Sequence, residues 1–189
     1  YHWRNYRESS SFSEKSLDKA VAARRRALQD HVRRQGWDAE VVEGSIGANR
    51  LVRRLPDPPP EVAVIVPTKD AAGLLAVATR GVLAGTVYPR LRLVVIDNGS
   101  VEPETHALFA ALRRDPRVTI LPMPGPFNFS DMNNRAVAAL DSELACFLNN
   151  DIEVVEPGWL AEMVSCLTPG VAAVGAKLLY PDGTVQHAG

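Results

Sequence analysis

The sequence predicts an open, doubly wound α/β domain that follows a short helical segment. Near-continuous apolar runs such as VAVIVP (62–67) and LRLVVID (91–97) recur at intervals of about 25–30 residues, with helix-like stretches between them. Apolar runs without alternation are typical of parallel strands whose two faces are both covered by helices. A proline-rich stretch at 56–60 separates this pattern from a different one in the N-terminal part.

Residues 1–60 are expected to form a helical segment with a linker, and residues 61–189 the main domain. Apolar residues at helical spacing predict a helix over 16–36, with Ser16 as the N-cap and a glycine as the C-terminal stop. The stretch 38–55 predicts two short strands around a Gly-Ser-Ile-Gly turn. The prolines that follow predict a stiff linker.

The main domain is expected to alternate strands with helices. The predicted strands are 62–67, 91–97, 118–122 and 144–149, and the predicted helices are 73–84, 103–114 and 130–140. Ser130 and Asp131 are expected to open the last of these helices. The end of the chain predicts a helix over 158–167, then a hairpin in which a strand at 171–180 returns through 184–187 after a Pro-Asp-Gly turn.

The composition indicates a soluble globular protein. Hydrophobic residues make up 46% and charged residues 23% of the 189 positions, which argues against disordered, collagen-like and disulfide-stapled chains. No apolar stretch approaches the roughly 18 residues of a membrane span, and the first residues lack the apolar core of a signal peptide. We therefore expect a cytoplasmic protein with buried, unpaired thiols at Cys146 and Cys166.

The charge is unevenly distributed along the chain. Residues 1–54 carry 12 basic and 7 acidic side chains, a net charge of +5, whereas residues 55–189 carry 9 and 15, a net charge of −6. A basic segment can touch nucleic acid or an anionic membrane surface, but arginines mixed with acids equally fit a solvated helix face. We expect no nucleic-acid partner. The apolar stripe of the helix predicted over 16–36 favours docking of this helix on the main domain. Peripheral contact of the helix with the inner face of the membrane is the alternative.

Polar residues gather just beyond the predicted strands, where a doubly wound sheet binds its ligand. The four segments are 67–70, 97–100, 124–129 and 149–153. Each alone is typical of a turn, but four at one edge of the sheet favour a binding crevice. The turn after the first strand contains neither GxGxxG nor GxxxxGK[ST], so dinucleotide sites and P-loop phosphate sites are not predicted.

Two carboxylates at this edge suggest a nucleotide diphosphate as the ligand. Asp97, fixed at a strand end, can accept a hydrogen bond from a pyrimidine imide N–H or from a ribose hydroxyl. Asp151, next to two amides, offers hard oxygen ligands that suit Mg²⁺ or Mn²⁺ bridging a diphosphate. A turn or N-cap role for Asp151 stays open as the alternative.

Several motifs, in their order and spacing, resemble the nucleotide-sugar half of a family-2 glycosyltransferase with the GT-A fold. They lie within residues 61–189 and read VAVIVPTKD, LVVIDNGS, PFNFSDMNNRA, ACFLNNDIEV, GWLAEMV and VGAKLLYPDGTVQHAG. The combination of FNFS, LNNDIEV and QHAG is the most specific part. Within this family the chain most resembles bacterial enzymes of O-antigen and cell-surface polysaccharide synthesis, rhamnosyltransferases among them.

The resemblance implies roles for individual residues in binding the nucleotide sugar. Pro67, Thr68 and Asp70 are similar to the loop after the first strand that contacts the base and ribose. Asp97 is similar to the carboxylate that reads the pyrimidine, and Asn98 follows it directly. The remaining positions that the resemblance implies, at a helix start facing the diphosphate, are Asn134 and Arg135.

The resemblance also implies a divalent-metal site. Asn149-Asn150-Asp151 occupies the family's Asp-x-Asp motif, with Asn149 in place of the first acid. This difference removes one negative charge but keeps an oxygen acceptor, so the two asparagines are expected to contact the nucleotide sugar. Asp151 is then expected to be the main protein ligand of the metal. Glu153 and His187 are candidates to supplement it.

The reaction that the resemblance implies is an inverting sugar transfer from a UDP- or dTDP-linked donor to a glycan or lipid-linked saccharide acceptor. Mn²⁺ or Mg²⁺ neutralises the leaving diphosphate, and a carboxylate deprotonates the acceptor. In the family that base follows the QHAG motif, so we expect it beyond Gly189 and expect this chain to be mainly a donor-binding part. A non-catalytic nucleotide- or partner-binding module is the alternative. A nucleotidyltransferase is disfavoured, because the first strand is not followed by a glycine-rich, basic phosphate loop.

Overall fold

A computed structural model of the chain describes residues 14–44 and 48–188. The chain divides into two compact units, Tyr1–Leu55 and Pro56–Gly189. Within the described residues, no helix combines the length and the apolar character needed to cross a bilayer.

The first unit contains one helix and a two-stranded hairpin. Helix α1 (Glu14–Arg34) is followed by the antiparallel strands β1 (Ala39–Glu43) and β2 (Asn49–Arg53), which confirms the predicted helix and strands. The prediction of Ser16 as the N-cap is wrong, because the helix already includes Glu14 and Ser16 lies inside it. The Gln29 side chain ties the helix to β1, because its Oε1 accepts the N–H of Val41 at 2.8 Å. Residues 45–47 of the predicted turn lie outside the described residues.

The second unit is built on a parallel four-stranded sheet. Its strands are β3 (Val62–Thr68), β4 (Leu91–Asp97), β5 (Val118–Pro122) and β6 (Leu144–Phe147), in the spatial order β5-β4-β3-β6. All three pairings are parallel, as the continuous apolar runs predicted. The chain therefore moves outward from β3 to β5 and then returns to the other side of β3 to form β6.

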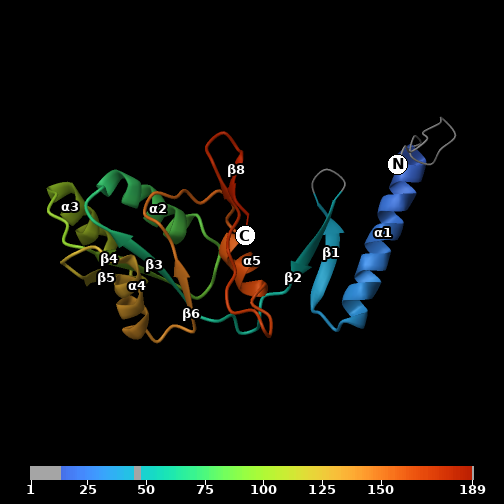
Figure 1. Cartoon of the computed structure of the whole chain (residues 1–189), viewed down its shortest axis with the longest axis horizontal. Helices are drawn as coiled ribbons and strands as arrows, with labels where there is room; N and C mark the ends of the chain where they lie inside the picture. The colour runs from blue at the N-terminus through green and yellow to red at the C-terminus, as the bar shows by residue number, and fades with distance from the viewer. Residues whose placement is uncertain (1–13, 45–47, 189) are drawn as a thin grey trace. The chain divides into compact units, whose positions relative to one another are not determined.

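Helices cover both faces of this sheet (Figure 1). They are α2 (Ala72–Ala84), α3 (Pro103–Leu112) and α4 (Phe129–Ala138). Because parallel crossovers are right-handed, the reversal of strand order places α4 on the face opposite to α2 and α3. The core agrees with this arrangement: Ala63, Ile65, Val94 and Ile96 form one buried cluster with Met132 and Ala136 of α4.

The start of α4 differs from the prediction. The helix begins at Phe129, and its N-cap is Asn128, whose side chain accepts the Asp131 N–H at 3.0 Å. Ser130 and Asp131 therefore lie inside the first turn. The sequence allowed this ambiguity, because asparagine, serine and aspartate are all good N-caps.

The last part of the chain folds into α5 (Trp159–Ser165) and a short hairpin of β7 (Leu178–Leu179) and β8 (Val185–His187). The hairpin and its turn are confirmed, since Asp182 Oδ1 accepts the Thr184 N–H at 2.9 Å. The predicted strand over 171–180 is wrong in its length. Residues 171–177 pair with no strand of the described chain. Only Leu178 and Leu179 form a strand, which pairs with β8.

Both cysteines are free thiols, as expected, and each is half-buried rather than fully buried. Burial raises the pKa of Cys146 to about 11. This thiol therefore stays protonated near neutral pH, and the thiol form is a poor nucleophile and metal ligand.

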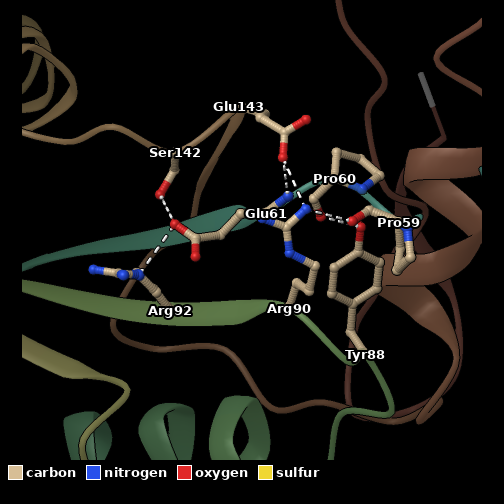
Figure 2. A network of polar contacts seen from close by, with 8 residues as sticks. All are labelled: Pro59, Pro60, Glu61, Tyr88, Arg90, Arg92, Ser142 and Glu143. Atoms are coloured by element: carbon tan, nitrogen blue, oxygen red, sulfur yellow. Dashed lines mark hydrogen bonds and ion pairs between the residues drawn. The ribbon is translucent and has the colours of Figure 1, made fainter. Parts of the chain in front are cut away.

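A polar network fixes the linker prolines at the amino ends of the strands (Figure 2). The Tyr88 hydroxyl donates to the Pro60 carbonyl at 2.7 Å, and the Arg90 guanidinium donates to the Pro59 carbonyl at 2.9 Å. Arg90 also pairs with Glu143, which precedes β6, at 3.1 Å. These contacts join the linker, β4 and β6 at the edge of the sheet opposite to the polar segments that follow the strands.

Glu61 is the central carboxylate of this network. It accepts a hydrogen bond from Ser142 Oγ at 2.9 Å and lies 3.1 Å from Arg92 Nε. The bond from Ser142, followed by the charges of Arg92 and Arg90, holds the pKa of Glu61 below its ordinary value of 4.5. A carboxylate whose pKa is lowered by folding stabilises the folded state above its unfolded pKa.

Replacing Glu61 with glutamine is therefore expected to lower the unfolding temperature most near neutral pH. The stabilisation by the charged form is lost as the pH falls below 4.5 and through the folded pKa, so the difference between the two proteins narrows in acid. Thermal unfolding of both proteins at pH 7 and at several values below 4.5 measures this. A difference that stays constant across the series contradicts it.

Candidate functional site

A cavity of about 230 Å³ opens beyond the carboxyl ends of β3 and β6. These neighbouring strands form the point where the strand order reverses, which is where doubly wound sheets bind ligands. The cavity is lined by Pro67, Thr68, Lys69, Phe127, Phe129, Asn149, Asn150 and Asp151. It thus brings together five residues predicted from separate strand ends, namely Pro67, Thr68, Asn149, Asn150 and Asp151.

Thr68 is the hub of hydrogen bonds under the cavity. It is 4% exposed, and its hydroxyl accepts from Asn150 Nδ2 at 3.0 Å and donates to the Asp70 carbonyl at 3.2 Å. Its carbonyl accepts the Asn98 N–H at 2.9 Å. Because the hydroxyl joins the end of β3 to the segment after β6, it orients the Asn150 amide within the wall of the cavity.

Asp70 lies in a strained turn beside the cavity. Asp70 and Ala71 have φ values of 55° and 59°, a left-handed conformation that non-glycine residues rarely adopt. The Oδ1 atom of Asp70 accepts the N–H groups of Val101 and Glu102 at 2.7 and 2.9 Å. The bond from Glu102, then that from Val101, lowers the pKa of Asp70. This carboxylate therefore joins the loops after β3 and β4, and it does not line the cavity.

Asp97 and Asn98 end β4 next to the cavity without lining it. Asp97 is the register partner of Thr68, and its Oδ1 accepts the Ser100 N–H at 2.8 Å. Asn98 is 4% exposed, and its Nδ2 donates to the carbonyls of Met123 at 2.8 Å and Gly125 at 3.2 Å. Asn98 thus holds the loop that follows β5, and its two amide hydrogens are used within the protein.

That loop carries two cavity residues which the sequence interpretation missed, Phe127 and Phe129. Their side chains are 68% and 44% exposed, respectively. The third missed residue, Lys69, follows Thr68 directly. Segment 124–129 is one of the four segments predicted at the edge of the sheet, but its two rings are not predicted as site residues, because phenylalanine usually belongs to a core.

The four other predicted residues lie outside the cavity. Asn134 and Arg135 are exposed on α4, and Arg135 pairs with Asp131 at 3.5 Å. Glu153 is exposed in the segment after β6, and His187 is exposed on β8. No group of three or more His, Cys, Asp or Glu side chains among residues 14–44 and 48–188 could hold a metal ion.

The cavity residues nevertheless fit a divalent ion that arrives with a phosphate ligand. Asp151 supplies one carboxylate, and Asn149 and Asn150 supply amide groups. Mg²⁺ is commonly held by one or two carboxylates together with substrate phosphates rather than by a cage of protein ligands. The donor set therefore suits a metal shared with a diphosphate, with the Lys69 ammonium as a further positive group.

The segment after Asp151 is anchored on α2. A Cβ atom at Gly81 would lie 2.9 Å from Val154 Cγ2 and 3.3 Å from the Val154 backbone nitrogen, so only glycine permits this close approach. Two residues of the adjoining loop extend the anchor: Val87 N–H donates to the Pro157 carbonyl at 2.8 Å, and Thr86 Oγ1 accepts from Trp159 Nε1 at 2.9 Å. These contacts fix the path of the chain that leaves the cavity at Asp151.

Replacing Gly81 with alanine is therefore expected to displace Val154 and the residues before it. We expect a loss of about 1–2 kcal/mol in the free energy of unfolding, typical of an overpacked contact. Gly73 lies on the same helix with nothing within 4 Å of an added Cβ. Gly73→Ala should leave stability unchanged or raise it by up to about 1 kcal/mol. Denaturant unfolding of both variants measures the contrast, and equal stabilities would contradict it.

Comparison with protein families identifies the second unit. The model of "Glycosyl transferase family 2" matches residues 63–187. This range runs from the second residue of β3 to the end of β8 and includes the whole cavity.

Two curated relatives match the full length of the chain. The protein y4gI of Sinorhizobium fredii is 41% identical over 192 residues, and the O-antigen biosynthesis protein RfbC of Myxococcus xanthus is 44% identical over 190 residues. The chain spans 21% and 15% of the lengths of these two proteins. The similarity therefore concerns one part of each relative.

A solved structure has the same fold. The mannosyltransferase PcManGT from Pyrobaculum calidifontis, in complex with GDP-Man and Mn²⁺, superposes with a TM-score of 0.54 over 82% of this chain and 44% of that chain. The two sequences are 21% identical, so this likeness concerns the fold alone. With a family match over most of its length and a parallel sheet of the GT-A type, the chain belongs to glycosyl transferase family 2.

Proposed function

We propose that this chain binds a nucleotide-diphosphate sugar, UDP- or dTDP-linked, and serves sugar transfer in the synthesis of a polysaccharide. The observation that carries the proposal is the cavity at the strand reversal, where Asn149, Asn150 and Asp151 stand opposite the end of β3. Family membership supports transferase chemistry, and the similarity to an O-antigen biosynthesis protein supports a glycan or lipid-linked saccharide as the acceptor.

In this proposal the nucleotide lies along the edge of the sheet. Asp97 and Thr68 end the neighbouring strands β4 and β3, and Asp151 lies in the segment that follows β6 on the other side of β3. Asp97 would accept from the base, as the sequence predicted, and the diphosphate would lie at Asp151 near Lys69.

The chain's own residues would orient the diphosphate for its departure. A divalent ion held by Asp151 would supply charge neutralisation on the leaving group. Thr68 orients Asn150 through its hydroxyl, and the Gly81 contact fixes the chain after Asp151. Asp151 is the single carboxylate among the eight cavity residues, so as a metal ligand it is not free to deprotonate the acceptor. We therefore place the catalytic base of an inverting transfer outside this cavity.

Isothermal titration calorimetry with UDP and dTDP, each with and without Mn²⁺, tests the proposal on the whole chain. Binding is expected for at least one nucleotide and is expected to tighten when Mn²⁺ is present. A chain that is folded by circular dichroism and binds neither nucleotide under either condition overturns the proposal. A sugar-transfer assay with a saccharide acceptor then separates an enzyme from a module that only binds.

A further inference from the structure

The two phenylalanines at the cavity are unusual in their exposure. Phe127 and Phe129 are 68% and 44% exposed, although fully burying a phenylalanine contributes about 1.5–3 kcal/mol to folding. They lie on either side of Asn128, and both line the same cavity as Lys69 and Asp151. Exposed apolar surface beside polar groups is typical of a ligand site.

The backbone that carries these rings is firmly held. At one end, the buried Asn98 side chain donates to the Met123 and Gly125 carbonyls. At the other end, Asn128 caps α4, and Asn133 Nδ2 donates to the Phe129 carbonyl at 2.8 Å. The loop is therefore fixed from both sides before any ligand binds, which lowers the entropy lost on binding.

We propose that Phe127 and Phe129 form a stacking platform for the planar base of the donor nucleotide. This inference rests on the proposed function and adds to it the residues that bind the base by its face. Aromatic side chains bind bases of any sequence by stacking, because every base has a π-face. The rings share the cavity with Thr68, whose register partner Asp97 is the carboxylate proposed to accept from the edge of the base. The phosphates would then extend toward Lys69 and Asp151.

The face and the edge of the base would thus be bound by different elements. Phe127 comes from the loop after β5, Phe129 is the first residue of α4, and Asp97 comes from the end of β4. Stacking supplies affinity without distinguishing uracil from thymine, whereas hydrogen bonding at the edge depends on the groups the base presents. Loss of a ring is therefore expected to weaken UDP and dTDP binding by similar factors.

Calorimetry with UDP, dTDP and Mn²⁺-pyrophosphate on single variants tests this inference. Phe127→Ala and Phe129→Ala are each expected to lower the affinity for both nucleotides by about 5- to 100-fold, the range typical of a lost stacking contact. Pyrophosphate has no base, so its affinity should be unchanged. Phe127→Tyr keeps an aromatic face and should retain most of the nucleotide affinity.

Phe147 provides a matched control, because it is 52% exposed on β6 and does not line the cavity. Phe147→Ala should bind nucleotides like the unaltered chain, and unfolding temperatures verify that every variant is folded. If the ring variants keep full affinity for UDP and lose it only for a UDP-sugar, the rings contact the sugar and the inference is overturned. If the unaltered chain binds no nucleotide at all, the proposed function fails first and this inference with it.

Discussion

Replacing Asp151 with alanine is expected to abolish the increase in UDP affinity that Mn²⁺ provides, and to leave metal-free UDP binding within about twofold. Asp151 is the single carboxylate among the cavity residues, and the neutral amides of Asn149 and Asn150 cannot replace its charge. Because removing groups that only orient metal ligands already costs 10- to 100-fold in metal affinity, we expect a loss of at least about 100-fold for Mn²⁺. Titration of UDP with and without Mn²⁺ measures both quantities.

Three further variants test whether the metal dependence of UDP binding belongs to Asp151. Asn149→Asp restores a second carboxylate in the cavity and should strengthen the Mn²⁺-dependent binding. Glu153→Ala removes an exposed carboxylate two residues beyond Asp151 that does not line the cavity, so its effect should be small. Asp97→Asn should weaken UDP binding with or without metal, because it replaces the carboxylate that is proposed to accept a hydrogen bond from the nucleotide base. Equal losses from Asp151→Ala and Asp97→Asn in the absence of metal would contradict this division of roles.

The part of the site that could be predicted from the sequence follows from the regularity of parallel sheets. Thr68 and Asp151 lie 83 positions apart in the sequence, yet both follow apolar runs that were identified as strands. Carboxyl ends of parallel strands meet at one edge, so the strand assignments were enough to place both residues at the same edge of the sheet. The order of the strands then decided which ends were neighbours, and the reversal at β3 placed β6 beside it.

The remaining part of the site depends on loop paths, which have no periodic signal. The sequence predicts a nucleotide contact for Asn98, and it gives no sign that the loop after β5 places the Met123 and Gly125 carbonyls at the Asn98 amide. The resemblance places Asp70 in the loop that contacts the base and ribose, and it gives no sign that a left-handed turn directs the Asp70 carboxylate to the N–H groups of residues 101 and 102. Both asparagine and aspartate bind backbone groups as readily as ligands, so residue type alone could not separate the two uses.

Replacing Asn98 with alanine is expected to be among the most destabilising single changes outside the apolar core. It removes two hydrogen bonds from a side chain that is 4% exposed and leaves the Met123 and Gly125 carbonyls without these donors. Buried polar groups that lose their partners cost about 1–3 kcal/mol each. We therefore expect the free energy of unfolding to fall by roughly 2–4 kcal/mol, as measured by chemical denaturation.

Asn98→Ala should also lower ligand affinity, although Asn98 does not line the cavity. Without its anchor the loop after β5 becomes more mobile, and Phe127 and Phe129 are no longer held in position before binding. UDP affinity should then fall together with stability, whereas pyrophosphate affinity should change less, because Asp151 is fixed separately through Gly81 and Val154. Asn134→Ala, an exposed substitution on α4, should alter stability by less than about 0.5 kcal/mol. An Asn98→Ala protein as stable as Asn134→Ala would show that the two carbonyl contacts do not hold the loop.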